Sequence, residues 1–304
     1  MGRRQGTWVG FVRNVIGVSL GCVFFGAVGR VTYASVALES ERGVHRFLSV
    51  EISPDGRLTA SVEGDSPPTG GYPSVRELVI RQMRNAAEVR IPLPCVREAE
   101  CWPESPSWSP DGKSLIFALR KPGIYERSVY SVAPDGSGLT KLLDFNGTIQ
   151  NLRYGPDGQV AMLATANAKK EAGPTEARQA IAGDLDEATP EQRIAVLENG
   201  SLRWASPRDL YVYEYDWRPG GRGFVGTAAP GDGDDNWYIA KLYAFGERDG
   251  SARILYATTS KQQQIADPKV SRDGSTVAFI AGIMSDFGGT GGEVYSLSID
   301  GGAY

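Results

Sequence analysis

The sequence predicts an all-β fold, a β-propeller of four-stranded blades, and three observations support this prediction. A strand–turn–strand unit recurs five times, a second hairpin follows it in several units, and the 304 residues include 38 Gly and 18 Pro. Two hairpins in each period of about 50 residues are typical of a propeller blade. A generic β-sandwich is the alternative, and five matching turns at near-regular spacing argue against it.

Each unit centres on a Pro-Asp-Gly turn or a close variant of it. The prolines of the first four units, and Arg272 in the place of proline in the fifth, are spaced by 56, 46, 63 and 53 residues. Pro pre-sets φ for a type I turn, Asp suits the next position, and Gly accepts the left-handed conformation that follows. The predicted turn residues are Pro54, Asp55, Gly56, Pro110, Asp111, Gly112, Pro156, Asp157, Gly158, Asp273 and Gly274.

The segments around these turns alternate β-branched and aromatic residues with others, as half-buried strands do. Second hairpins are expected around Pro134-Asp135-Gly136 and around Asp249-Gly250, and a strand at residues 294–299 leads to a further turn at Asp300. The chain therefore accounts for about five blades, the fifth of which is unfinished at residue 304. We expect residues 38–304 to form a partial propeller domain whose ring is incomplete and leaves open sheet edges.

One stretch, residues 168–198, departs from the strand pattern. It is polar, charged and rich in helix formers, and it includes Asp184, Asp186 and Glu187. We expect a partly helical insertion between the third and fourth blades, either solvated or shaping one face of the domain.

Residues 1–37 are predicted to be a targeting segment. Three arginines precede an uncharged run at residues 14–29, and Ala34-Ser35-Val36-Ala37 fits a cleavage site after Ala37. Sixteen residues of helix span about 24 Å, less than the roughly 30 Å of a hydrocarbon core. A secretory signal peptide is therefore preferred, and an uncleaved N-terminal membrane anchor is the alternative. Lipid attachment at Cys22 is disfavoured, because Ser19 stands where such signals usually have Leu.

Charge and cysteine content exclude several classes of function. Cleavage after Ala37 removes four arginines and no acid, which changes the formal net charge from −4 to −8. This balance gives no general basic field for nucleic acid.

The two cysteines outside the leader could form a disulfide. An exported chain would keep Cys95 and Cys101 where disulfides persist, and a bridge between them would contribute about 2 kcal/mol in the chain-entropy model. Two ordinary thiols are the alternative.

The motifs associated with catalysis or metal binding are weak. Gly17-Val18-Ser19-Leu20-Gly21 matches the nucleophile elbow of hydrolases but lies in the predicted leader, and His45 is the only histidine. His45 is expected to be an ordinary residue at the start of the first blade, and a zinc site is nearly excluded. The acidic loop at residues 231–236 does not match the spacing of a calcium loop. No catalytic, cofactor-binding or metal-binding residue is therefore assigned.

A group of aromatic residues in the fourth unit is expected to pack between blades. Their spacing is that of strand residues facing one side of a sheet. They are Tyr211, Tyr213, Tyr215, Trp217, Trp237, Tyr238 and Tyr243.

The Ser-Pro-Asp-Gly units resemble the TolB-like, WD40-like propeller repeats. The segments at residues 209–217 and 226–243 are similar to the propellers of exported bacterial members of the prolyl oligopeptidase family of serine peptidases. The resemblance covers about residues 44–304. It implies a propeller that precedes an α/β-hydrolase domain, covers its active site and filters substrates by size. The hydrolase domain with its Ser, Asp and His does not occur within residues 1–304, so no catalytic residue carries over.

The resemblance therefore leads us to expect the non-catalytic propeller portion of an exported, periplasmic or secreted peptidase, truncated before its catalytic domain. Its partners would be a peptide or protein ligand and either the missing hydrolase domain or a second copy. Nucleic acid is not expected, and membrane contact is expected only through an uncleaved leader. One alternative is a free-standing TolB-like propeller that binds a protein or peptide at the cell envelope. A propeller enzyme with acidic catalytic residues is a weaker one, because no carboxylate pair stands out.

Overall fold

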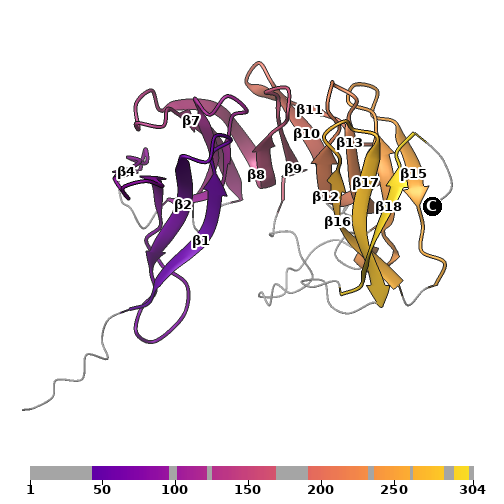
Figure 1. The fold of residues 1–304 in the computed structure, drawn as a ribbon, viewed down its shortest axis with the longest axis horizontal. Coiled ribbons are helices and arrows are strands. Elements are labelled where there is room, and N and C mark those ends of the chain that lie inside the picture. The colour runs from indigo at the N-terminus through magenta and orange to yellow at the C-terminus, as the bar shows by residue number, and fades with distance from the viewer. Residues whose placement is uncertain are drawn as a thin grey trace, which may run out of the picture. The chain divides into compact units, whose positions relative to one another are not determined.

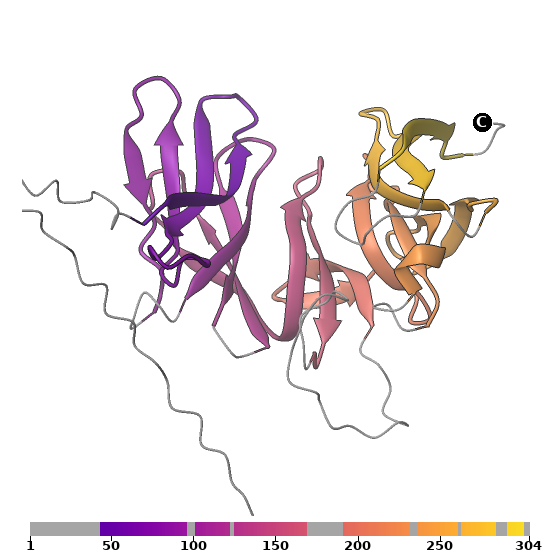
Figure 2. The ribbon, with the colours of Figure 1, turned by 90° about the horizontal axis from the view of Figure 1, so that it is seen from below.

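The computed structural model describes residues 43–95, 101–121, 125–168, 191–231, 236–260, 263–283 and 291–300. These residues form antiparallel β-sheets, as Figures 1 and 2 show, and the predicted all-β fold is confirmed. The predicted leader at residues 1–37 lies outside the described residues. In the part of the chain that the structure describes, no helix is long and apolar enough to cross a membrane.

The strands group into five units in chain order, which we call blades 1 to 5. Within each blade, every described strand pairs with the next one along the chain. Blade 1 comprises β1 (His45–Ile52), β2 (Leu58–Asp65), β3 (Glu77–Gln82) and β4 (Glu88–Arg90). Blade 2 comprises β5 (Trp102–Trp108), β6 (Leu115–Arg120), β7 (Glu126–Val132) and the first half of β8 (Thr140–Tyr154). Blade 3 comprises the second half of β8, β9 (Val160–Ala166), β10 (Gln192–Glu198) and β11 (Ser201–Trp204).

Blades 4 and 5 follow the same plan. Blade 4 comprises β12 (Tyr211–Trp217), β13 (Phe224–Ala229), β14 (Lys241–Phe245) and β15 (Ala252–Tyr256). Blade 5 comprises β16 (Gln263–Val270), β17 (Thr276–Ile283) and β18 (Glu293–Ser298), so three of its strands are among the described residues.

The long strand β8 serves two blades. Residues 140–146 pair with β7, and residues 147–154 pair with β9. Gly147, where the pairing changes, has φ +149, and a β-carbon there would lie 2.0 Å from the carbonyl oxygen of Thr165. Only glycine allows this close approach, so Gly147 lets one strand pass from blade 2 to blade 3.

The recurring turns owe their sequence to a repeated hydrogen-bond pattern. In blade 2 the Ser109 hydroxyl donates to Asp111 Oδ1 at 2.7 Å and accepts the Ser114 backbone N–H at 2.9 Å. Asp111 Oδ1 also accepts the Lys113 N–H at 3.1 Å, and Gly112 has φ +68. The same arrangement occurs around Ser53 in blade 1 and Ser271 in blade 5. The serine and aspartate therefore lock the loop that leads from the first strand to the second.

Apolar side chains fill each junction between consecutive blades. We call the face of a blade toward the preceding blade its front and the opposite face its back. The back of blade 1 (Ala60, Val62) packs with the front of blade 2 (Leu115, Phe117), and clusters of the same kind join blades 2 and 3, 3 and 4, and 4 and 5. Apolar burial at these junctions is what holds the blades together.

Two expectations were wrong in detail. Residues 192–198 of the expected insertion form β10, whose Ile194, Ala195 and Val196 are all buried, so the interruption lies within blade 3 rather than between blades 3 and 4. Because acidic residues directly precede β10, the sequence pattern did not reveal its short apolar segment. The remainder of the expected insertion, residues 169–190, lies outside the described residues. Trp237 and Tyr238 lie in a 3-10 turn, η2 (Trp237–Ile239), and not on a strand.

Candidate ligand-binding pocket

A pocket with a volume of about 400 Å³ lies where the first strands of blades 2 to 5 end. Its walls come from the last residues of β5, β8, β12 and β16 and from the turns that follow these strands. Trp108, Arg153, Asp216, Trp217 and Arg272 supply its large and charged side chains. Because each blade repeats the same strand–turn unit, four different sequence segments present equivalent positions to one cavity.

The turns around the pocket also contact one another. In blade 3, Gly155 stands where the turns of blades 1, 2 and 5 have serine, and the nearby Asp157 carboxylate accepts the backbone N–H groups of Gly220 and Gly221 at 2.8 and 3.2 Å. Asp157 therefore ties the blade 3 turn to the blade 4 turn instead of closing its own loop. These contacts fix the rim of the pocket.

An ion pair lies in the pocket wall between blades 3 and 4. Arg153 Nη1 lies 3.2 Å from Asp216 Oδ1, and the two side chains are 29% and 18% exposed. Arg153 also donates to the carbonyl oxygen of Tyr215 and lies over the Tyr215 ring at 4.4 Å. Asp216 Oδ2 accepts the Val270 N–H at 2.7 Å, which joins blade 4 to blade 5. The pair is therefore held in place by three elements.

The ring of Tyr215 lies against the Arg153 guanidinium and so supports the ion pair. Its hydroxyl donates to the carbonyl oxygen of Asn151 at 2.7 Å, and burial raises the pKa of its phenol to about 12. The phenol therefore stays protonated at physiological pH and acts as a hydrogen-bond donor.

Two tryptophans give the pocket apolar surface. Trp217 is 7% exposed, and its ring centroid lies 4.5 Å from that of Phe224. A β-carbon on Gly155 would lie 2.6 Å from the Trp217 ring, so the absence of a side chain at residue 155 makes room for the indole. Trp108 is also 7% exposed and donates its Nε1 hydrogen to the Glu51 carbonyl oxygen at 3.4 Å.

Glu51 adds a carboxylate near this wall. Desolvation raises the pKa of its side chain, and the positive charge of Arg153 opposes that rise. Glu51, Ser107, Arg153, Asp216 and Lys269 occupy the same position in the first strands of blades 1 to 5, one residue before the last. Of these five residues, Arg153 and Asp216 line the pocket, so the repeat varies in charge at a position that reaches it.

Arg272 is the exposed cation of the pocket. It stands where the other four turns have proline, and no hydrogen bond or ion pair holds its guanidinium within the described residues. An arginine so placed has five N–H donors for an acceptor group of a ligand. The departure of Arg272 from the repeat was visible in the sequence, and it was the signal that could have singled out this residue.

A β-bulge interrupts the first strand of every blade. The pairing register shifts between Phe47 and Ser49, Glu104 and Ser107, Gln150 and Arg153, Val212 and Glu214, and Ala266 and Lys269. Bulges turn a side chain away from its regular direction and are frequent next to binding sites. In blades 2 to 5 they precede the strand residues that line the pocket. The sequence analysis did not find them.

No family model matches the sequence, and no curated protein matches it. Solved structures do resemble the chain. An oligogalacturonate lyase in complex with manganese superposes with a TM-score of 0.54 at 14% identity, over 83% of this chain and 61% of that chain. A prolyl endopeptidase superposes with a TM-score of 0.53 at 11% identity, over 80% of this chain and 33% of that chain. A protein described as a dipeptidyl aminopeptidase IV, from Bacteroides ovatus, superposes with a TM-score of 0.51 at 12% identity, over 79% of this chain and 38% of that chain.

The chain is a β-propeller. At these identities the likeness shows the fold alone, and the chain spans less than two thirds of each of these three proteins. The propeller fold explains why four turns meet at one pocket, since the blades repeat around a common centre.

The other sequence-predicted residues of the propeller lie away from the pocket or at its rim. Pro110 and Pro156 line it, whereas Asp55 and Asp111 are exposed in their turns. Cys95 and Cys101 are joined by a disulfide with their Cα atoms 6.2 Å apart. Among the described residues, no group of three or more His, Cys, Asp or Glu side chains is placed to hold a metal ion. Residues 232–235 of the acidic loop lie outside the described ranges.

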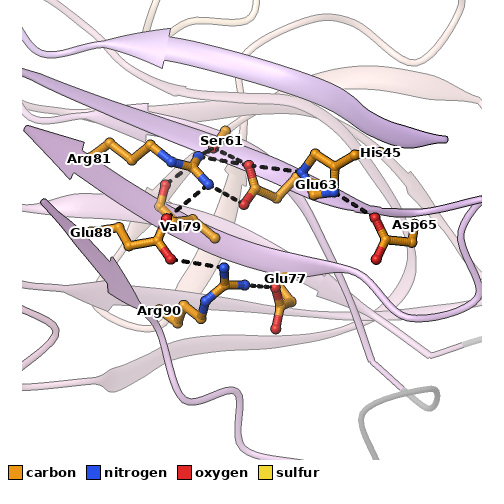
Figure 3. A network of polar contacts seen from close by, with 9 residues as sticks. All are labelled: His45, Ser61, Glu63, Asp65, Glu77, Val79, Arg81, Glu88 and Arg90. Atoms are coloured by element: carbon orange, nitrogen blue, oxygen red, sulfur yellow. Dashed lines mark hydrogen bonds and ion pairs between the residues drawn. The ribbon is translucent and has the colours of Figure 1, made fainter. Parts of the chain in front are cut away.

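His45 begins β1, far along the strand from the pocket. Its Nδ1 lies 2.7 Å from Asp65 Oδ1, and its Nε2 lies 3.7 Å from Glu63 Oε2. The imidazole thus belongs to a charged network in blade 1 that Figure 3 shows.

Proposed function

We propose that the propeller is the non-catalytic portion of an exported serine peptidase of the prolyl oligopeptidase family, and that its pocket binds the peptide substrate. The observation that carries the proposal is the pocket itself, which offers apolar walls and an exposed guanidinium within about 400 Å³. Ligand sites of this size combine apolar lining with a few well-placed polar groups. An extended peptide segment fits this chemistry.

The proposed binding mode assigns a role to each part of the wall. Trp108 and Trp217 would contact an apolar side chain of the peptide, and Arg272 would donate to a carbonyl or carboxylate oxygen. Arg153 is already engaged by Asp216, so it holds the wall in shape and does not compete for the ligand. Access to a hydrolase domain would then be gated by whether a peptide passes or stays in this pocket.

Peptide binding can be measured by calorimetry or by quenching of tryptophan fluorescence with a library of short peptides. Because a charge-assisted hydrogen bond contributes about 1.5–3 kcal/mol, Arg272→Ala should weaken binding roughly tenfold or more. Arg84→Ala, which removes an exposed arginine from the β3–β4 turn of blade 1, is the matched control and should bind as the parent does. Equal affinity of all three proteins would refute the pocket as the binding site.

Two further parts of the proposal have their own tests. We propose export through residues 1–37, and N-terminal sequencing of the protein from its producing cell should then begin at Leu38. We also propose that this chain does not hydrolyse peptides by itself. Turnover that disappears on His45→Gln would contradict this, since His45 is the only histidine.

A free-standing TolB-like propeller that binds a peptide at the cell envelope is the second form of the proposal, and it predicts the same pocket variants. The mass of the native protein, measured by immunoblot against the propeller, separates the two forms. A band far heavier than the propeller favours the peptidase.

A further inference from the structure

Arg272 differs from three other arginines at the pocket end of blades 3 to 5. Arg153 belongs to the ion pair in the pocket wall, and Arg218 Nη2 lies 2.8 Å from Asp300 Oδ1. Arg222 donates to backbone carbonyl oxygens of its own turn and of the blade 5 turn. Arg272 is exposed and lines the pocket, yet within the described residues its guanidinium has neither a hydrogen bond nor an ion pair. It is therefore the arginine of this group that is available to a ligand.

The two carboxylates closest to Arg272 in the turn and the pocket wall are engaged by other groups. Asp273 follows Arg272 directly, but its Oδ1 accepts hydrogen bonds from the hydroxyls of Ser271 and Ser275, at 2.5 and 2.9 Å. Asp216 Oδ1 faces its ion-pair partner, and its Oδ2 accepts a backbone N–H of blade 5. The charged residues that line the pocket are two arginines and one aspartate, with a net charge of +1. A ligand can supply the missing negative charge.

Apolar surface lines the same cavity as Arg272. Trp108, Trp217 and Val270 contribute to it. Ligand pockets commonly have volumes of about 300–1,000 Å³, so a cavity of about 400 Å³ holds only a short segment of a peptide. The negative charge and the apolar group that these walls favour must therefore lie close together in the ligand.

The C-terminal residue of a peptide meets both requirements. Its carboxylate and its side chain are attached to the same Cα atom, whereas the backbone on either side of an internal residue presents only neutral amides. A guanidinium binds a carboxylate through two parallel N–H···O bonds, and such charge-assisted bonds are roughly twice as strong as bonds between neutral groups. An unpaired arginine beside apolar walls therefore favours a free terminus over the middle of a chain.

We propose that the pocket selects peptides by their C-terminal carboxylate, which Arg272 binds, together with an apolar side chain on the same terminal residue. This inference rests on the proposed function, because it names the part of a peptide that enters the proposed pocket. It adds a requirement for charge, since a peptide amide has nearly the same shape as the acid but no negative charge. The side chain of Asp or Glu carries the same carboxylate chemistry, and the test separates the two sources.

Calorimetry of the full chain with three N-acetylated tripeptides tests the inference. Ac-Ala-Ala-Leu has a terminal carboxylate, its amide has none, and the amide of Ac-Ala-Glu-Leu carries a carboxylate only on a side chain. The parent chain should bind the first peptide about tenfold more tightly than either amide, because a hydrogen bond to a charged group contributes more than one to a neutral group. Arg272→Gln should reduce the affinity for the free acid to that for its amide and leave the affinity for the amide unchanged.

Arg84→Gln, which changes an exposed arginine of the β3–β4 turn, is the matched control and should keep the preference for the free acid. If the parent binds the acid and its amide equally, and Arg272→Gln weakens both, the carboxylate inference is overturned while the pocket stands as a peptide site. A preference for the acid that survives in Arg272→Gln also overturns the inference. Binding of the Glu peptide amide as tightly as the free acid overturns the terminal position of the carboxylate. If the parent binds none of the three peptides, the inference fails together with the proposed function.

Discussion

The Glu63 carboxylate, wholly buried on β2, accepts hydrogen bonds from both terminal nitrogens of Arg81 on β3, at 2.7 and 2.5 Å. Desolvation acts to raise the pKa of Glu63, and the hydrogen bonds and charge of Arg81 outweigh it, so that the pKa lies below its usual value. The pair occupies the front of blade 1, at positions that are apolar in the other blades. It is therefore the feature that sets this blade apart from the rest of the repeat.

Glu63→Ala should destabilise the propeller by about 3 kcal/mol. The substitution leaves Arg81, which is 23% exposed, with Glu88 and the Ser61 hydroxyl as its polar partners but without its buried counter-charge, and a broken buried ion pair typically costs 3–5 kcal/mol. Urea unfolding measures the change. Glu77→Ala removes the carboxylate that pairs with Arg90 on the same face, but both of those side chains are largely exposed, so it should cost less than about 1 kcal/mol. Equal losses for the two variants would show that burial of Glu63 does not matter.

Gly155→Ala should loosen the pocket wall and destabilise the chain by about 1–3 kcal/mol. The added methyl group would lie 2.6 Å from the Trp217 ring, and a packed indole that also meets Phe224 has little room to retreat. Thermal unfolding and tryptophan fluorescence report the two effects. The same substitution at Gly291, which has open space around it, should leave both unchanged. An unaltered fluorescence spectrum in Gly155→Ala would contradict the proposed contact.

The repeat made most of the fold predictable, because turn residues such as Pro110 and Gly112 act locally and alternate apolar residues mark strands on either side. The extent of β10 was less visible, because Ile194 and Val196 follow a charged stretch that resembles an exposed helix. The pocket was not predicted. Arg153 and Asp216 are 63 residues apart in the sequence, and nothing local to either reveals that successive blades bring them within 3.2 Å.

Arg272 is a further residue whose place in the pocket the local sequence does not reveal. Its replacement of proline in the fifth turn is visible in the sequence, but its proposed role depends on three other turns that reach the same cavity. The local sequence pattern therefore identifies Arg272 as unusual, and only the packing of the blades suggests a function for it that can be tested.

His45 should titrate above 6.5, the usual pKa of histidine. The hydrogen bond to Asp65 is the largest cause of the rise, burial opposes it, and the charges of Glu63 and Asp65 add to it. A raised pKa in the folded state means that His45 contributes stability below pH 6.5 and that this contribution disappears as the pH rises through the folded value. Proton NMR of the single imidazole measures the pKa directly. Asp65→Asn should lower it, and a value at or below 6.5 in the parent would disprove the contact.

Acid should weaken the turn at the start of β17 as the pH falls from 3.8, the usual pKa of an aspartate, toward about 2. Hydrogen bonds from Ser271 and from the backbone and hydroxyl of Ser275 lower the pKa of Asp273 to about 2. Because the folded value lies below 3.8, this carboxylate contributes stability above pH 3.8, and the contribution is lost as the pH falls toward about 2. Asp273→Asn should therefore flatten the dependence of the melting temperature on pH over that interval, measured by circular dichroism. Ser271→Ala removes the largest cause of the shift and should flatten it partly. If the melting temperature of Asp273→Asn falls in acid as steeply as that of the parent, protonation at this turn does not limit the stability of the propeller in acid.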